Sequence, residues 1–364
     1  MRFLFTAWSG GGNIHPLVAL GTRLLARGHD VRVLAGGALR QRFESAGMTF
    51  EEQPGKGLRA VADDVEAAIA RERPDVVVVD FMQPAALCAA ETANVPLVAF
   101  VHTLYTRVAV SAMSPMGMSG SVDGVNDLRH DLGLPPVESL PALLDPCALV
   151  LVVTAVELDR PHEPVPANVR FVGPLVEGAG ADAGWAPPGS PLVHVSMGTV
   201  PSDADLMPIV QHALDAIAGL DVHGFVTLAG KADRPWSSAT DPDIGSLRVP
   251  ANCAVSGYVR HAAVLPHTAV FVTHAGLGSV GVALTFGVPM VALPITHEQP
   301  ANAAHVAALG AGVQLDRAAD ADALRDAIVE VMREPRYRDT ARRVGDRLRA
   351  DGNGQRAVDE LESL

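Results

Sequence analysis

Apolar residues recur along the chain in two alternating patterns. Short runs of Val, Ile and Leu, such as Val76–Val79, have the length of a buried strand. Between them lie longer stretches, such as Leu58–Arg71, whose apolar positions recur as on one face of a helix. This alternation predicts βαβ units and an α/β fold with parallel sheets. The elements expected in the first half are Arg2–Ala7, Ile14–Arg27, Asp30–Leu34, Leu58–Arg71, Asp75–Asp80, Gln83–Ala93, Pro96–Val101, Leu149–Thr154 and Val169–Val172.

The second half repeats the same pattern after a break rich in Gly, Ala and Pro at Glu177–Gly189. A chain of 364 residues exceeds what one core usually organises. We therefore expect two domains, 1–178 and 190–345, and a last helical segment, 346–364, that packs back on the first domain. The expected elements of the second half are Leu192–Ser196, Asp205–Ala218, Phe225–Ala229, Val270–Thr273, Gly278–Phe286, Met290–Leu293 and Ala301–Leu309.

Composition narrows the function classes. The formal net charge is -13 and no basic run is visible, which argues against binding nucleic acid or an anionic membrane surface. The three cysteines lack the spacing of a metal knuckle or a redox pair and are read as core thiols of a reducing compartment. No apolar run approaches the roughly 20 residues of a membrane helix. The apolar stretch within Met1–Trp8 is too short for a signal peptide, so a cytoplasmic protein is expected.

The strongest local motif is Thr273–Ser279, which reads T-H-A-G-L-G-S between an apolar strand and an apolar helix. A glycine-rich turn of this kind exposes backbone amides at the positive end of a helix, which suits a diphosphate. His274 adds a further hydrogen-bond donor. The glycines alone favour an ordinary tight turn with a buried histidine, and it is the sequence downstream that favours the diphosphate site.

The longer stretch Thr273–Asn302, reading T-H-A-G-L-G-S-V-G-V-A-L-T-F-G-V-P-M-V-A-L-P-I-T-H-E-Q-P-A-N, resembles the donor-binding signature of family 1 glycosyltransferases. The resemblance extends to Gly257–His261, Val195–Thr199 and Gly12–Leu17, and it is strongest for actinobacterial enzymes that attach deoxysugars to antibiotics. It implies the GT-B fold, in which two Rossmann-like domains face each other across a cleft. The first domain would bind the acceptor and the second the nucleotide sugar.

The resemblance also implies roles for residues of the second half. Tyr258 would stack on the nucleobase, Val259 would pair with the base through its backbone, and His261 would face the ribose. The residues at the diphosphate positions are Ser196, Thr199, His274, Gly276, Gly278 and Ser279.

Two further positions concern the sugar and the nucleoside. Glu298 and Gln299 match the acidic-Gln pair that binds the hydroxyls of the donor sugar, since a carboxylate and an amide together accept and donate hydrogen bonds. Plant members of the family place a ribose-binding Glu where this chain has Val282. An apolar residue there favours a dTDP-sugar over a UDP-sugar as the co-substrate, and no other cofactor is expected.

The catalytic position departs from the family pattern. Relatives carry Gly-His-x-x-Pro at the first helix, and the position of that catalytic His is occupied by Asn13, whose amide cannot act as a base. The candidates for proton removal are His15, Asp80, which matches the Asp that orients the catalytic His, and His102 in reserve. The alternative is structural: Asn13 as an N-cap, Asp80 as the cap of the next helix, and His15 as a half-buried residue of a first turn.

The acceptor pocket is expected in the first half, from Trp8, His102 and the methionines Met113, Met116 and Met118 of the irregular region 111–146. Those methionines fit an adaptable apolar wall, and core packing explains them almost as well. Two Asp-x-Asp strings, at 203–205 and 320–322, stand at predicted helix starts and are read as caps, so that no metal site is expected.

Together these features predict an inverting, metal-independent glycosyltransferase that moves a sugar from a nucleotide diphosphate to a small apolar aglycone. The alternatives are a transferase acting on lipid-linked or sterol acceptors, a nucleotide-sugar epimerase of the same architecture, and a non-catalytic nucleotide-sugar-binding partner of another transferase. The aglycone, the sugar, the type of glycosidic bond and the formation of a homodimer are left open.

Overall fold

Each half of the chain folds around its own parallel sheet in the computed structural model, which confirms the α/β prediction. Unit 1 comprises Met1–Glu177 with Asp351–Leu364, and unit 2 comprises Gly178–Ala350. The structure describes residues 1–8, 12–106, 121–159, 165–177, 186–198, 203–228, 246–257, 259–296, 298–352 and 354–364; for 203–206 it describes the backbone alone.

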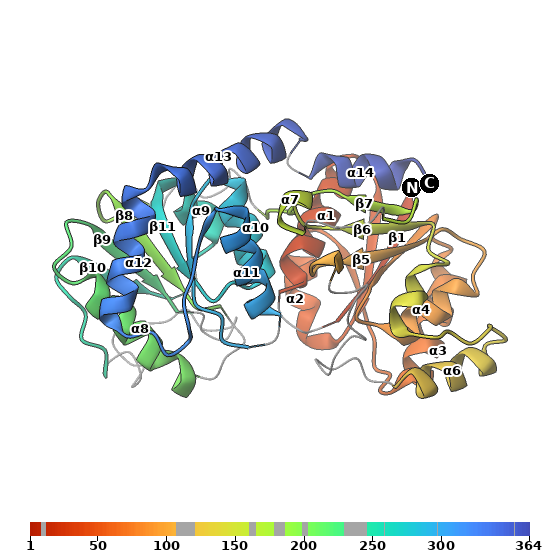
Figure 1. The fold of residues 1–364 in the computed structure, drawn as a ribbon. Helices are drawn as coiled ribbons and strands as arrows, with labels where there is room; N and C mark the ends of the chain where they lie inside the picture. The colour runs from red at the N-terminus through yellow and green to blue at the C-terminus, as the bar shows by residue number, and fades with distance from the viewer. Residues whose placement is uncertain are drawn as a thin grey trace. The chain divides into compact units, whose positions relative to one another are not determined.

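Unit 1 contains a seven-stranded sheet in the order β3-β2-β1-β4-β5-β6-β7, covered by helices (Figure 1). Its strands are β1 (Arg2–Ala7), β2 (Asp30–Ala35), β3 (Thr49–Glu52), β4 (Val76–Asp80), β5 (Leu97–Val101), β6 (Leu149–Val152) and β7 (Val169–Phe171). Its helices are α1 (Ile14–Ala26), α2 (Arg40–Glu44), α3 (Leu58–Glu72), α4 (Pro84–Glu91), α6 (Val122–Asp131), α7 (Val156–Asp159) and α14 (Gln355–Glu362), with 3-10 turns η1 (Gly37–Leu39) and η2 (Leu140–Leu144).

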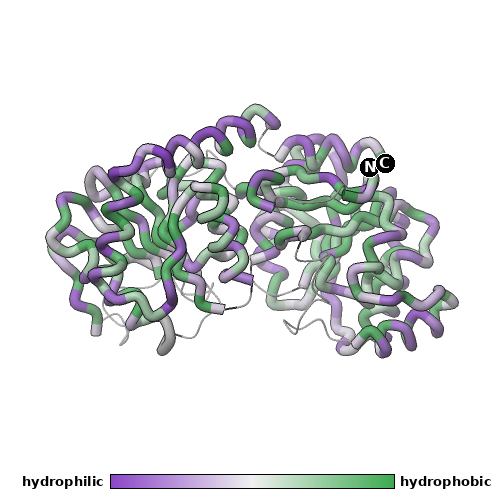
Figure 2. Tube along the Cα trace, viewed as in Figure 1, coloured by the Kyte–Doolittle hydropathy of each residue, from purple (hydrophilic) through white to green (hydrophobic). Residues whose placement is uncertain are grey.

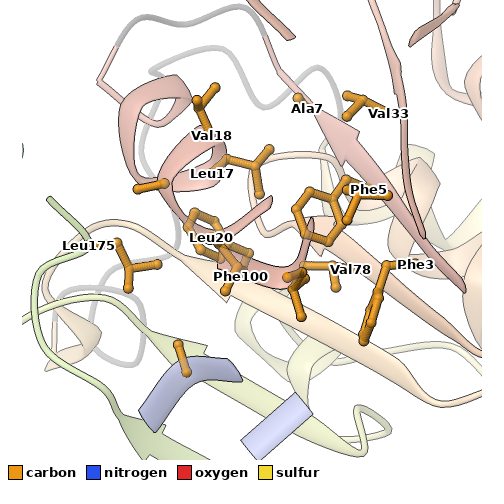
Figure 3. Close-up of a cluster of buried hydrophobic side chains, with 14 of the residues drawn as sticks. Phe3, Phe5, Ala7, Leu17, Val18, Leu20, Val33, Val78, Phe100 and Leu175 are labelled. Carbon is orange, nitrogen blue, oxygen red and sulfur yellow. The ribbon is translucent and has the colours of Figure 1, made fainter. Parts of the chain in front are cut away.

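The central strands β1, β4, β5 and β6 of unit 1 are buried on both faces, which explains why they read as continuous apolar runs rather than alternating ones. Phe3 and Phe5 of β1 enter one core with α1, whereas Leu4 between them enters the other core with α3 and α4. Figure 3 shows the first of these cores, where side chains of β1, α1, β4 and β5 point toward one another. Hydrophobic residues accordingly follow the strands, and polar residues follow the outer helices (Figure 2).

The last helix belongs to the first unit. Ala357, Val358 and Leu361 of α14 are buried in the same core as Phe3 and Phe5. The two ends of the chain lie side by side in this unit (Figure 1). The structure places the change of unit at Asp351 rather than at 346, because α13 continues through Ala350 within unit 2.

Unit 2 contains a six-stranded sheet in the order β10-β9-β8-β11-β12-β13. Its strands are β8 (Leu192–Ser196), β9 (His223–Thr227), β10 (Cys253–Ser256), β11 (Thr268–Thr273), β12 (Met290–Ala292) and β13 (Gly312–Gln314). Its helices are α8 (Asp203–Ile217), α9 (His261–Val264), α10 (Leu277–Thr285), α11 (Gln299–Leu309), α12 (Ala321–Arg333) and α13 (Pro335–Ala350), with a 3-10 turn η4 (Leu265–His267). Val193 and Val195 enter the main core, while His194 lies on the opposite face of β8.

Three strands were not anticipated, namely β3, β10 and β13, and all three form edges of the sheets. An edge strand is short and paired on one side only, so it needs no long apolar run. The region 111–146 also contains more regular structure than expected, since α6 and η2 lie within it. None of the helices in the described part of the chain combines the length and the apolarity that a membrane crossing requires.

Candidate active site

The residues of interest gather where each sheet reverses its strand order. In unit 1 the chain runs outward from β1 to β3 on one side and from β4 to β7 on the other, so that β1 and β4 flank the switch point. In unit 2, β8 and β11 occupy the same position. Ligands of open α/β sheets bind outside the carboxyl ends of the strands at such switch points. Asp80 and Ser196 end β4 and β8, whereas Asn13 and His274 lie in the turns that follow β1 and β11.

The turn between β11 and α10 is held in a strained conformation. Ala275 has φ 61°, in the left-handed region that residues other than glycine seldom occupy. Two side chains hold it there: its N–H donates to Thr273 Oγ1 at 3.3 Å, and its carbonyl accepts from Asn302 Nδ2 at 2.9 Å. Gly276 is the N-cap of α10 and makes no side-chain cap, so the amides of the first turn remain available to a ligand.

His274 is enclosed by two glycines. A Cβ on Gly198, which follows β8 with φ +77°, would stand 2.5 Å from the imidazole, and one on Gly276 would stand 2.4 Å from Nε2. Burial lowers the pKa of His274 to about 4, against a smaller opposing effect of the Ser196 backbone. The ring is therefore neutral at physiological pH, with one nitrogen as a donor and the other as an acceptor.

A chain of hydrogen bonds leads from the interior of unit 2 to α10. His194 Nδ1 lies 3.0 Å from the Phe225 carbonyl, and since a carbonyl only accepts, Nδ1 carries the proton. Burial lowers the pKa of His194 to about 4, so its Nε2 is an acceptor and faces His261 Nδ1 at 3.5 Å. His261 Nε2 lies in turn 3.3 Å from Ser279 Oγ. We call these groups the His194 chain; it holds Ser279 in the first turn of α10.

The other predicted donor residues have the following positions. Ser196 is the last residue of β8 and is buried, Val259 and Val282 are half-buried, and Gly278 has open space where a Cβ would project. Tyr258 and Thr199 lie outside the described residues.

Gln299 and Glu298 begin α11. The Gln299 side-chain oxygen accepts from the Ile295 and Thr296 amides at 2.9 and 3.0 Å, so only its NH₂ group can serve a ligand. Glu298 is the N-cap residue and is half-buried. The pair therefore offers a carboxylate and an amide donor at the start of one helix.

In unit 1 the Asn13 side chain does not cap α1, although Asn13 occupies the N-cap position. Its Nδ2 donates instead to Asp80 Oδ2 and to the Trp8 carbonyl, both at 2.6 Å. Reversing the amide would set its oxygen against these two acceptors, so the orientation is fixed. Asp80 is fully buried, and its Oδ1 accepts from the Met82 N–H at 3.0 Å rather than capping α4.

His102 completes this arrangement. It directly follows β5, and its Nε2 lies 3.1 Å from Asp80 Oδ1. The Phe81 ring packs edge-on against the imidazole, with centroids 4.9 Å apart. We refer to Asn13, Asp80, the Met82 amide and His102 as the Asp80 network. It brings together two predicted catalytic residues and the reserve candidate.

His15 is not part of the Asp80 network. It lies in the first turn of α1, where its Nδ1 is 3.1 Å from Glu177 Oε2, and Arg42 pairs with the same carboxylate oxygen. Burial opposes ionisation of Glu177, but the His15 and Arg42 contacts outweigh it and lower the pKa of this carboxyl group. The His15 side chain is 47% exposed, so the expectation of a half-buried residue understated its exposure.

The expected acceptor residues are only partly described. Trp8 is half-buried beside Asn13, whereas Met113, Met116 and Met118 lie outside the described residues. The chain after β5 is anchored by Asp159, a fully buried carboxylate that accepts from the Tyr105 and Thr106 amides and from Thr106 Oγ1.

The Asp-x-Asp string at 320–322 caps a helix, as predicted, because Asp320 accepts from the Ala323 amide at 2.9 Å at the start of α12. The side chains of the string at 203–205 lie outside those that the structure describes. Among the described residues, no group of three or more His, Cys, Asp or Glu side chains is arranged to hold a metal ion.

Sequence reasoning gave no role to His194, Asn302 and Gly198. His194 carried a signal, since it is the polar residue inside the apolar strand Leu192–Ser196. Asn302 ended the motif from which the resemblance was drawn, and the structure shows that it holds the Ala275 carbonyl. The role of Gly198 depends on a side chain far away in the sequence and left no local signal.

Comparison with known proteins extends these observations. Residues 10–172 match the family description Glycosyltransferase Family 4, and residues 226–364 match the Erythromycin biosynthesis protein CIII-like, C-terminal domain. The chain is similar to 4'-demethylrebeccamycin synthase of Lentzea aerocolonigenes, with 29% identity over 100% of this chain and 99% of that protein.

Two solved structures show the same fold. The glycotransferase of kitacinnamycin matches with a TM-score of 0.80 and 24% identity, covering 100% of this chain and 98% of the other. The spinosyn rhamnosyltransferase SpnG matches at 20% identity over 100% of both chains, with TM-scores of 0.72 when complexed with thymidine diphosphate and 0.73 when complexed with spinosyn aglycone.

Proposed function

Since the chain belongs to the family 1 glycosyltransferases of the GT-B fold, we propose that it transfers a sugar from a dTDP-linked donor to a small apolar natural-product aglycone. The reaction we propose is a single displacement that inverts the anomeric carbon and needs no metal ion. The donor sugar is proposed to be a deoxysugar, because the chain is also similar to demethyllactenocin mycarosyltransferase of Streptomyces fradiae, with 26% identity over 97% of this chain and 84% of that protein.

The observation that carries this proposal is the strained turn before α10. It leaves free backbone amides at the positive end of the nine-residue helix α10, beside a neutral His274 that is held between Gly198 and Gly276. Neutral donors preorganised in this way stabilise the negative charge that develops on a departing diphosphate. In the proposed mechanism this turn takes the place of a metal ion.

The proposed preference for a thymidine nucleotide rests on Val282, which is half-buried on α10. An apolar side chain there gives no hydrogen bond to a ribose 2′-hydroxyl, and burying that hydroxyl unpaired costs free energy. SpnG, which has the same fold, forms a complex with thymidine diphosphate, and this is consistent with the proposal.

Calorimetric titration with dTDP and with UDP in the presence of EDTA tests the donor proposal. We expect micromolar binding that favours dTDP and survives chelation. Val282→Glu should shift the preference toward UDP, while Val282→Gln, similar in size but uncharged, should shift it less. Preference of the wild-type protein for UDP would refute the thymidine assignment, and no binding of either nucleotide would refute the donor site.

Inversion is tested by the configuration of the product. With dTDP-α-D-glucose as the donor and a phenol as the acceptor, we expect a β-glucoside, which NMR coupling at the anomeric proton identifies. An α-glucoside would exclude a single displacement and would point to a retaining route.

A further inference from the structure

We propose that His102 is the general base of this enzyme and that Asp80 and Asn13 are positioning residues that act through it. The proposal rests on the proposed sugar transfer and adds to it the group that removes the acceptor proton. It follows from the Asp80 network, in which the usual position of the base holds Asn13 while a histidine from another strand makes a hydrogen bond to the same aspartate.

The hydrogen bonds determine which nitrogen of His102 acts. A carboxylate only accepts, so the 3.1 Å contact with Asp80 Oδ1 places the proton of neutral His102 on Nε2. Nδ1 then carries the lone pair. Asp80 is held by three donors, namely the Met82 amide, Asn13 Nδ2 and His102 Nε2, which fix the carboxylate and through it the ring. A base oriented by a buried carboxylate is the arrangement that general-base catalysis requires.

Accessibility separates His102 from the other members of the network. Asn13 is 1% exposed and Asp80 is 0% exposed, whereas the His102 side chain is 15% exposed. His102 is therefore the network member that a substrate can touch. Its position after β5, next to β4 at the switch point, is also where ligands bind in such sheets.

His15 is the competing histidine, and its surroundings are less suitable. Arg42 binds the carboxylate oxygen that His15 contacts, and its guanidinium lies 3.4 Å from His15 Nδ1. This nitrogen is therefore already engaged by a carboxylate and by a guanidinium, whereas a base needs an available lone pair. No cation contacts His102 in an analogous way among the described residues, and Asp80 stabilises the imidazolium.

In the proposed step the acceptor loses its proton and gains the sugar. The acceptor O–H bond breaks and its proton moves to His102 Nδ1, while the acceptor oxygen forms a bond to the anomeric carbon of the sugar. The bond between that carbon and the diphosphate oxygen breaks, and its electron pair leaves with the diphosphate. The positive charge on His102 is stabilised by the Asp80 carboxylate and is removed when the proton passes to solvent.

The test compares His102→Gln with a matched control. His29 is also paired with a carboxylate, at 2.8 Å from Glu362, and its side chain is 13% exposed and packs edge-on against a phenylalanine. It lies at the amino end of β2, whereas the Asp80 network lies at the carboxyl ends of the parallel strands. The probes are dTDP-glucose as the donor and two phenols as acceptors, assayed at a mildly alkaline pH at which 4-nitrophenol is largely ionised and 4-methoxyphenol is not.

We expect His102→Gln to lower kcat with 4-methoxyphenol by about 10²–10⁴-fold, the usual contribution of a general base. The loss with 4-nitrophenol should be at least tenfold smaller, because an ionised acceptor needs no base. Binding of dTDP should stay within about twofold, and added imidazole should restore part of the activity of His102→Ala. His29→Gln and His15→Gln should retain the wild-type rates.

An equal loss with both phenols, or an equal loss in His29→Gln, would overturn the assignment of His102 as the base. If the wild-type protein glycosylates neither phenol, release of glucose from dTDP-glucose by water compares His102→Gln with His29→Gln, and only the first variant should lose this activity. Failure of the proposed function is a separate result, because in that case the wild-type protein itself would bind no nucleotide.

Discussion

Each unit carries a buried polar network beside the strands of its switch point, and the two networks differ in charge. The Asp80 network is built around a fully buried carboxylate that is held by donors from the turns after β1, β4 and β5. The His194 chain consists of imidazole, hydroxyl and carbonyl groups, and burial lowers the pKa of His194 to about 4. The same topology therefore supports an anionic site in one unit and a neutral one in the other.

This difference matches the chemistry proposed for each site. A buried carboxylate stabilises a positive charge that appears during the reaction, such as an imidazolium. It would repel a diphosphate, which instead requires donors without a neighbouring anion. The turn before α10 meets that requirement with its backbone amides and a neutral His274. The contrast leads to four predictions, taken from the largest expected effect to the smallest.

Neutralising the Asp80 network should have the largest effect. In Asp80→Asn an amide group faces the Asn13 amide, so that two donors oppose each other and His102 loses its counter-charge. We expect kcat to fall by about 10³-fold, roughly 4 kcal/mol, with little change in dTDP binding. Asp159→Asn, which alters another fully buried carboxylate of unit 1, is the control for lost stability. A similar loss of kcat in both variants would contradict a specific role for Asp80.

Shortening one buried side chain of α14 should destabilise unit 1 without destabilising unit 2. Leu361→Ala empties a fully buried position in the core of unit 1 and should cost about 3 kcal/mol of unfolding free energy, the usual range being 2–5 kcal/mol. Hydrogen exchange should rise in β1 and stay unchanged in β8, with dTDP binding retained. The matched variant Leu324→Ala in α12 should show the reverse pattern. If hydrogen exchange rose equally in β1 and β8 in both variants, this would contradict the prediction that the two cores are independently stable.

Acid should destabilise unit 2 through His194. Between about pH 6.5 and pH 4 the unfolded chain binds a proton at this residue that the folded protein, with its pKa at about 4, does not bind. Stability must therefore fall as the pH falls through this window, by about 2 kcal/mol between pH 7.5 and pH 5 for this group. His194→Phe, which keeps a ring beside Phe225 and Phe271, should remove that part of the loss. Denaturant unfolding at pH 7.5 and pH 5 measures this loss of stability in both proteins. The same loss in His194→Phe as in the wild-type protein would contradict the prediction.

The smallest effect concerns the enclosure of His274. Gly198→Ala places a methyl group 2.5 Å from the imidazole, whereas Gly219→Ala, at almost the same φ of +79°, meets nothing within 4 Å. Both variants should lose about 1 kcal/mol of stability through the backbone conformation. Only Gly198→Ala should weaken dTDP binding, by about tenfold, which is 1.4 kcal/mol. Equal affinities in the two variants would show that the position of His274 is unimportant for the nucleotide.

The sequence allowed the donor site of unit 2 to be predicted more fully than the Asp80 network of unit 1. Most of the donor site lies within the continuous stretch Thr273–Asn302, so one motif specified the turn, the helix and the start of α11. The Asp80 network is assembled from Asn13, Asp80 and His102, which only the strand order brings together. The pairing of β4 with β5 could not be deduced from the residues between them. For this reason His102 remained a reserve candidate, and His15, nearer in sequence to Asn13, was placed ahead of it.

The same reasoning applies to the fold. Central strands such as β4 are buried on both faces and show themselves as apolar runs, whereas the edge strands β3, β10 and β13 do not. The Gly198 contact with His274 depends on β8 pairing with β11, with Ser196 beside Thr273. Contacts of this kind are properties of the sheet rather than of any local segment.

The place of α14 has a consequence for how the protein is made. Domains tend to fold as units in the order in which they are synthesised. Residues 1–177 of unit 1 leave the ribosome before unit 2, yet the core of unit 1 also requires Ala357, Val358 and Leu361. All of unit 2 is translated before these residues. The nascent chain must therefore carry an unfinished first unit, with the surface that α14 will cover still exposed, while the second unit is already able to fold.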